Sequence, residues 1–120
     1  MPKNRDLRER TMVFAVVIIQ FCRELPTTAE GRHIGGQLLR AGTGVASNYR
    51  AVCRARSRAE FIAKLGTVIE EADEADFWLE LAVRGDVMPG DAVRDLRGEA
   101  NELAAIFTSS QKTARRNGQH

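Results

Sequence analysis

Apolar residues recur at spacings of three and four in four separate stretches of the chain. The first stripe consists of Leu7, Thr11, Phe14, Ile18, Phe21 and Leu25. This spacing is typical of one face of an amphipathic α-helix, and Pro26 cannot continue a helix. The sequence therefore predicts a first helix that begins near Arg5 and ends before Pro26.

The first predicted helix is apolar beyond its stripe as well. Its additional apolar residues are Val13, Val16, Val17 and Ile19. A helix on the outside of a monomeric bundle carries fewer apolar side chains on its other faces. We therefore expect this surface to contact a partner.

A second helix is predicted after Thr27 and Thr28, which are candidate N-caps. Glu30 follows in the first turn, where a carboxylate favours the positive end of the helix dipole. The apolar stripe consists of Ile34, Leu38, Ala41, Val45 and Val52, with Asn48 at a stripe position, and the helix also contains Gly35, Gly36, Gly42 and Gly44. Each interior glycine costs up to about 1 kcal/mol relative to alanine, which suggests close approach of a neighbouring helix.

Ser57 and Glu60 form a capping-box pattern that predicts the start of a third helix. This helix is expected to run from Arg58 to Arg84, and Gly85 is expected to end it in a left-handed conformation. Its stripe consists of Phe61, Leu65, Val68, Ala72, Asp76, Leu79 and Val83.

Pro89 and Gly90 indicate a short loop before a fourth helix. The fourth stripe consists of Val93, Leu96, Ala100, Leu103, Phe107 and Ser110. The segment from about residue 111 lacks apolar periodicity, so we expect a flexible C-terminal tail. Four amphipathic helices joined by short turns predict an all-α fold, an antiparallel up-down-up-down four-helix bundle formed as a single domain over residues 1–120.

Composition leaves the partner class open. The chain has 18 Lys and Arg against 16 Asp and Glu, and the resulting charge of +2 does not by itself indicate nucleic-acid binding. The apolar run 12–19 is shorter than the roughly 20 residues of a membrane span, and no signal-peptide pattern accompanies it. We expect a cytoplasmic protein without membrane partners, in which Cys22 and Cys53 stay reduced.

Three motifs give the chain a family resemblance: LLRAGTGVASNYR at 38–50, RARSRAEFIAKLG at 54–66 and EEADEADFW at 70–78. From His33 to Leu81 the chain resembles the bacterial four-helix-bundle family of 23S rRNA-intervening sequence proteins. The resemblance implies rings, typically homopentamers, with no assigned catalytic residues. The segment 81–87, with its early Gly85, departs from the family pattern.

The polar residues of the second and third helices are expected to meet across the bundle. If the two helices run antiparallel about a turn near Arg56, Arg40 lies at the level of residues 72–74. This arrangement predicts an ion pair from Arg40 to Glu74 or Asp73. Together with Asn48, these residues would fix helix register and oligomer geometry. A binding or catalytic site built on them remains the alternative.

The sequence contains no pattern that favours an enzyme. The acidic residues 73–80 lack the Glu-x-x-His pairs of di-iron bundles, so we expect no metal and no other cofactor. No arrangement of serine, cysteine and histidine suggests a nucleophile. The first hypothesis is therefore a non-enzymatic, self-associating scaffold or adaptor.

The second hypothesis rests on a basic cluster at the turn between the second and third helices. Its members are Arg50, Arg54, Arg56, Arg58 and Lys64. Ring assembly would repeat this cluster into a collar suited to the phosphates of RNA or DNA. Tyr49 is the only aromatic residue nearby, so such binding should depend weakly on sequence. A solvated charged turn with no ligand is the alternative.

Overall fold

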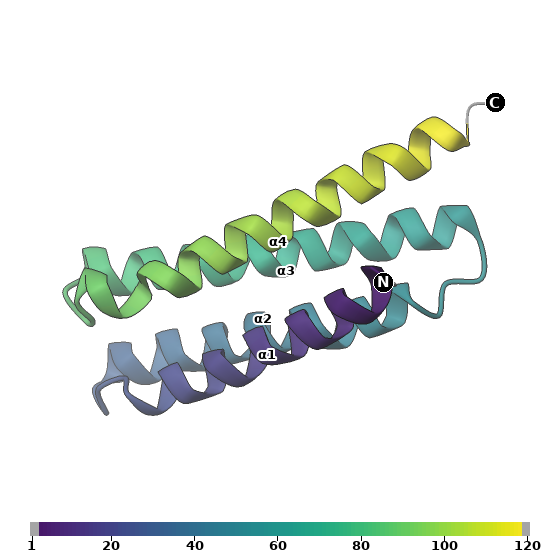
Figure 1. The fold of residues 1–120 in the computed structure, drawn as a ribbon. Coiled ribbons are helices and arrows are strands. Elements are labelled where there is room, and N and C mark those ends of the chain that lie inside the picture. Colours follow the sequence, from purple (N-terminus) through teal and green to yellow (C-terminus); the bar gives the residue numbers. More distant parts are fainter. Residues whose placement is uncertain (1–2, 119–120) are drawn as a thin grey trace.

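The computed structural model describes residues 3–118, and among these every regular element is a helix. The helices are α1 (Lys3–Arg23), α2 (Ala29–Val52), α3 (Arg58–Arg84) and α4 (Gly90–Asn117). Successive helices alternate in direction along one elongated bundle (Figure 1). The predicted all-α, up-down-up-down four-helix bundle is confirmed.

The helices form a ring of neighbours in chain order. α2 packs against α1 and α3, α3 packs against α4, and α1 meets α4 in the smallest of the four contacts. The molecule measures 52 × 23 × 21 Å along its principal axes. The α1–α2 and α3–α4 turns lie at one end, and the α2–α3 turn lies at the other, near the end of α4 (Figure 1). The two ends of the bundle are therefore built from different turns and carry different residues.

The core consists of the predicted stripes. Phe14, Ile18, Leu38, Leu65 and Phe107 are all at most 2% exposed. Burial of each such side chain contributes about 1.5–3 kcal/mol, so the stripes hold the helices together. The core also includes four residues outside the predicted stripes, Ala15, Tyr49, Ala75 and Ala82.

Side chains cap the starts of α2 and α3 as the sequence predicts. The Thr28 hydroxyl accepts from the backbone N–H of Gly31 at 3.1 Å, and the Ser57 hydroxyl accepts from that of Glu60 at 3.0 Å. The Glu60 carboxylate in turn accepts from the backbone N–H of Arg56 at 3.0 Å. The capping box therefore closes one residue earlier than its usual form and fixes the α2–α3 turn.

The end of α3 differs from the prediction. Gly85 has φ −88° and is not left-handed, whereas Asp86 has φ 59°. The N–H of Val87 donates to the Ala82 carbonyl at 2.8 Å, and that of Asp86 donates to the Val83 carbonyl at 3.1 Å. This is a Schellman motif with aspartate in the left-handed position, which short polar side chains tolerate. The expectation for Gly85 was wrong by one residue.

α4 continues past the end of its apolar stripe. The helix ends at Asn117, and the Gln111 side chain donates to the Ile62 carbonyl of α3 at 3.0 Å. Helix and side-chain contact thus extend into the segment predicted to be a tail. The flexibility of that segment in solution stays a prediction.

Two glycines of α2 allow close approach of neighbouring elements. A Cβ at Gly42 would lie 2.7 Å from the γ-carbons of Ile18, so the glycine lets α1 pack closely. The carboxylate of Glu71 in α3 occupies the space beside Gly44. Gly36 has open space around it, so close approach does not explain that glycine.

Candidate functional site

The charged side chains of the bundle fall into two groups with different surroundings. We call the part of the bundle from the α1–α2 and α3–α4 turns to the level of Arg10 the paired half. Every ion pair among the described side chains involves one of five arginines there, whereas Arg23 and Arg32, beside the α1–α2 turn, form none. The five paired arginines are Arg10, Arg40, Arg84, Arg94 and Arg97. We call Arg50, Arg54, Arg56, Arg58 and Lys64, around the α2–α3 turn, the basic end.

Arg40 links α2 to α3 in the paired half. Its guanidinium contacts the carboxylate of Glu74 and lies 3.6 Å from that of Glu71. The indole N–H of Trp78 also donates to Glu74, at 3.2 Å. Burial raises the pKa of Glu71, and the nearby Arg40 charge partly opposes that shift. The sequence predicted the contact with Glu74 but missed Glu71.

The other members of the predicted polar network lie apart from this cluster. Asp73 is exposed and forms no ion pair among the described residues. The Asn48 amide donates to the carbonyl of Gly44, within its own helix, at 2.8 Å. The structure therefore brings Arg40 and Glu74 together and leaves Asn48 and Asp73 outside their contact.

α4 carries the remaining cross-helix ion pairs. Arg97 donates to Asp76 of α3 at 2.7 Å, and Arg10 of α1 donates to Glu99 at 2.7 Å. The hydrogen bonds from Arg10 to Glu99 and Glu102 raise the pKa of its guanidinium, and the bond to Asp76 raises that of Arg97. The Arg10 contact provides the polar link in the small α1–α4 interface.

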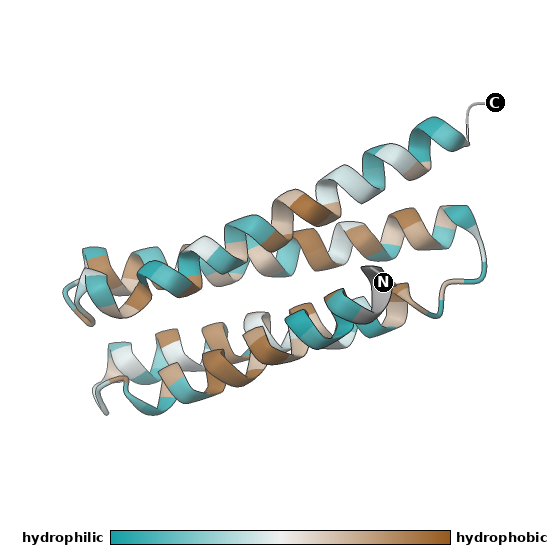
Figure 2. Cartoon of the chain, in the orientation of Figure 1, coloured by the Kyte–Doolittle hydropathy of each residue, from teal (hydrophilic) through white to brown (hydrophobic). Residues whose placement is uncertain are grey.

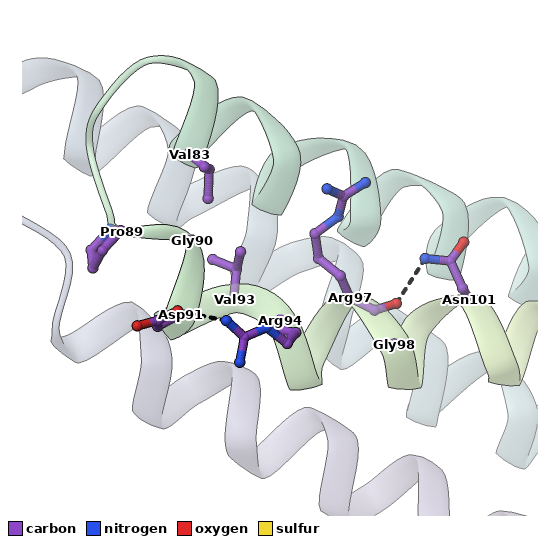
Figure 3. Close-up of a pocket in the computed structure, with 9 residues that line it drawn as sticks. All are labelled: Val83, Pro89, Gly90, Asp91, Val93, Arg94, Arg97, Gly98 and Asn101. Atoms are coloured by element: carbon purple, nitrogen blue, oxygen red, sulfur yellow. Dashed lines mark hydrogen bonds and ion pairs between the residues drawn. The ribbon is translucent and has the colours of Figure 1, made fainter.

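A hollow of about 520 Å³ lies beside the start of α4 in the paired half (Figure 3). Arg94 and Arg97 line it, but Arg94 pairs with Asp91 at 2.6 Å and Arg97 with Asp76. The cations of this hollow are thus neutralised by the protein's own carboxylates. Its charge pattern offers little to an external anion.

The basic end has the opposite character. None of its five side chains forms an ion pair with a described residue. A hollow of about 410 Å³ lies between the end of α2 and the start of α3, and we call it the basic hollow. Its lining consists of Ser47, Arg50, Ala51, Arg54, Arg56, Glu60 and Lys64. The structure therefore gathers four of the five predicted cations around one cavity.

The fifth cation of the basic end, Arg58, points elsewhere. Its side chain lies near Gly118, so it faces the end of α4. Sequence reasoning also missed Arg8, which reaches this region from α1. Arg8 and Arg50 together line a smaller hollow with Thr11, Met12 and Ala46. Only the packing of α1 on α2 reveals that Arg8 and Arg50 are neighbours.

The outward face of α1 carries four of the seven exposed large apolar side chains of the described chain. Met12, Val13, Val16 and Val17 are 37–50% exposed. Figure 2 shows the middle turns of α1 mostly in the hydrophobic colour. Ile19, by contrast, is partly buried. Despite this apolar run, none of the described helices is long and apolar enough to cross a membrane.

No cluster of three or more His, Cys, Asp or Glu side chains is arranged to hold a metal ion in residues 3–118. Cys22 is half-buried, and burial raises the pKa of its thiol. The recognisable features of the chain are thus a basic hollow and an apolar helix face on an antiparallel four-helix bundle.

Comparison with known proteins places the bundle in a family. The profile of the 23S rRNA-intervening sequence proteins matches residues 3–109, and the chain belongs to that family. The resemblance inferred from the three motifs is confirmed. No curated protein matches the chain.

A solved structure supports the same assignment. It is the crystal structure of a protein of unknown function from the S23 ribosomal protein family of Bacteroides thetaiotaomicron VPI-5482. The two chains share 29% sequence identity, with 92% of this chain and 99% of the other covered, and a TM-score of 0.85. The fold is therefore common to both proteins over nearly their full lengths.

Proposed function

We propose that this protein is a non-enzymatic scaffold or adaptor that works as a homo-oligomer. The observation that carries the proposal is the exposed apolar face of α1. Four large apolar side chains on one helix face form a contiguous patch of the kind that marks protein–protein contacts. The expected number of five protomers rests on the family resemblance alone.

The proposal is tested by measuring mass in solution at micromolar concentration. Sedimentation of the wild-type protein should give an oligomer, and Val13→Lys with Val16→Lys should give a monomer with an unchanged helical circular dichroism spectrum. Gln20→Lys, an exposed polar position of the same helix, serves as the control and should remain oligomeric. A wild-type monomer would refute self-association.

The basic end supports a second candidate function, binding of RNA or DNA. Its five cations lack ion-pair partners in the described chain and are free to neutralise phosphates. The name of the family refers to ribosomal RNA, which fits a polyanionic partner. Self-association would repeat the basic end and strengthen its field.

This candidate function is tested by titrating labelled RNA and DNA duplexes with the wild-type protein at low salt. We expect both duplexes to bind, with affinity that falls steeply as salt rises. Absence of binding at low salt would refute it and would leave the scaffold proposal standing.

A further inference from the structure

We infer that the basic hollow is a phosphate-binding pocket, and that with Arg8 it forms a track for consecutive phosphates of a nucleic-acid backbone. This inference rests on the second candidate function. It specifies the side of the basic end that carries the ligand and the residues that hold the ligand. The shared ligand chemistry is a phosphate monoanion or dianion.

Helix stability does not account for all the cations of the basic hollow. Arg50 lies in the last turn of α2, where the helix dipole favours a cation, but Arg56 lies just before the start of α3, where the dipole disfavours one. Four cations around one cavity also repel one another, and Glu60 is the only carboxylate in the lining. Glu60 already accepts the Arg56 backbone N–H. An external anion would remove this imbalance.

The side chains that line the basic hollow have the chemistry of a phosphate site. Three of the four cations, Arg50, Arg54 and Arg56, are arginines, whose planar guanidinium can hold two phosphate oxygens at once. Ser47 also lines the hollow, but its hydroxyl donates to the Gly44 carbonyl of α2 at 3.4 Å. The lining contains no aromatic side chain, so a base would find no stacking surface there. The pocket therefore suits a phosphate and not a nucleobase.

The cations of the basic hollow are continued by one on α1, Arg8. Arg50 lines both the basic hollow and the smaller hollow that contains Arg8. A second phosphate could bind between Arg8 and Arg50 while the first lies in the basic hollow. A nucleic-acid backbone that crosses α3, α2 and α1 in this order meets cations at both hollows. A chain of phosphates gains from both hollows, whereas an isolated phosphate gains from one.

Arg58 provides a matched control on the other side of α3. It faces the end of α4, where Lys112, Arg115 and Arg116 also lie. Arg54→Ala/Arg56→Ala and Arg58→Ala/Arg115→Ala remove the same charge from the same end of the bundle. Only the first pair removes residues of the basic hollow. All four positions are exposed, so both variants should fold.

The experiment measures the affinity of a labelled RNA duplex across a salt series for each variant. Each lost phosphate contact lowers the slope of log K against log salt by about one. We expect Arg54→Ala/Arg56→Ala to lower the slope by about two, Arg8→Ala by about one, and the control pair by less than one. Calorimetry measures whether inorganic phosphate also binds. This measurement distinguishes a pocket for a free anion from one for a nucleic-acid backbone.

The outcomes separate the two levels of the proposal. A wild-type protein that binds no duplex refutes nucleic-acid binding itself. A duplex that binds with equal slope losses in the two double variants refutes the pocket, because the charge would then act diffusely. Tight binding of inorganic phosphate without duplex binding refutes the track. A slope loss confined to Arg8 and the basic hollow supports it.

Discussion

The paired half and the basic end share one core but satisfy their charges in opposite ways. In the paired half, arginines such as Arg40 and Arg97 cross from one helix to the next and meet a carboxylate. At the basic end, Arg54 and Arg56 face a hollow without an ion pair in the described chain. The paired half thus joins neighbouring helices through ion pairs, whereas the cations of the basic end have no ion-pair partner among the described residues.

The comparison also shows why net charge was a poor guide. A formal charge of +2 describes the whole chain and conceals the separation of paired from unpaired cations. Arg8, Arg50, Arg54, Arg56 and Lys64 lie together because the α2–α3 turn and the neighbouring part of α1 share one end of the bundle (Figure 1). Arg23 and Arg32, beside the α1–α2 turn, also form no ion pair among the described residues, but they line neither the basic hollow nor the smaller hollow beside it. The proposal of a polyanionic partner therefore rests on the position of the cations around the two hollows and not on total charge.

The largest expected effect concerns the core that both regions share. Leu65 lies toward the basic end and Leu79 in the paired half, and both are at most 1% exposed. Leu65→Ala and Leu79→Ala should each lower the free energy of unfolding by about 2–5 kcal/mol, measured by urea denaturation. If only Leu65→Ala caused a negligible loss, the basic end would be loosely packed. The two regions would then differ in packing order and not only in charge.

The next effect compares helix caps at the two ends. Ser57 caps α3 at the basic end, and Thr28 caps α2 in the paired half. Replacement of either by alanine should cost about 1 kcal/mol, because one backbone N–H loses its partner. Thermal denaturation of Ser57→Ala and Thr28→Ala checks this. A much larger loss for Ser57→Ala would show that its cap supports the whole α2–α3 turn.

A smaller effect tests the charge comparison itself. Arg97→Ala removes a partly exposed ion pair with Asp76 and should cost about 0.5–1 kcal/mol. Arg56→Ala removes an unpaired cation near the start of α3 and should leave stability unchanged or slightly increased. Urea denaturation at low and moderate salt measures both. Equal losses for the two variants would contradict the assignment of Arg56 as unpaired.

The smallest effect is a pH dependence in the paired half. Burial raises the pKa of Glu71 in the folded state, so the folded protein holds this proton more tightly than the unfolded chain does. Its contribution to stability is present below the ordinary carboxyl pKa of about 4.3 and is lost as pH rises through the raised folded pKa. Glu71→Gln should flatten this decline in denaturation curves measured from about pH 4 upward.

A control separates burial from charge at this position. Glu70→Gln removes the same charge from an exposed neighbour of Glu71. If Glu70→Gln and Glu71→Gln changed the pH profile equally, burial beside Gly44 would not be the cause.

Local patterns predicted most of the fold. Apolar spacing identified the stripe residues, and the hydroxyls of Thr28 and Ser57 identified two helix starts. The prediction of a left-handed Gly85 was wrong because an aspartate can also adopt this conformation, and here Asp86 does so. Tyr49 was missed as a core residue because its ring stacks on Phe107, a contact between helices that are distant in the sequence.

The candidate site was less predictable, for a physical reason. Four of its cations lie close together in the sequence around one turn, so the cluster could be recognised without a structure. Arg8 and Glu71 belong to their sites only through contacts between helices. The direction of a side chain, such as that of Arg58 toward α4, depends on packing that no local pattern specifies.

The difference between the two regions predicts that the basic end, and not the paired half, meets an external polyanion. Hydrogen–deuterium exchange of the wild-type protein, with and without an RNA duplex at low salt, tests this prediction most directly. The account predicts added protection in peptides covering 47–64 and the start of α1, with no change around 76–101. Protection centred on 76–101, or none in 47–64 while the duplex is bound, would contradict it.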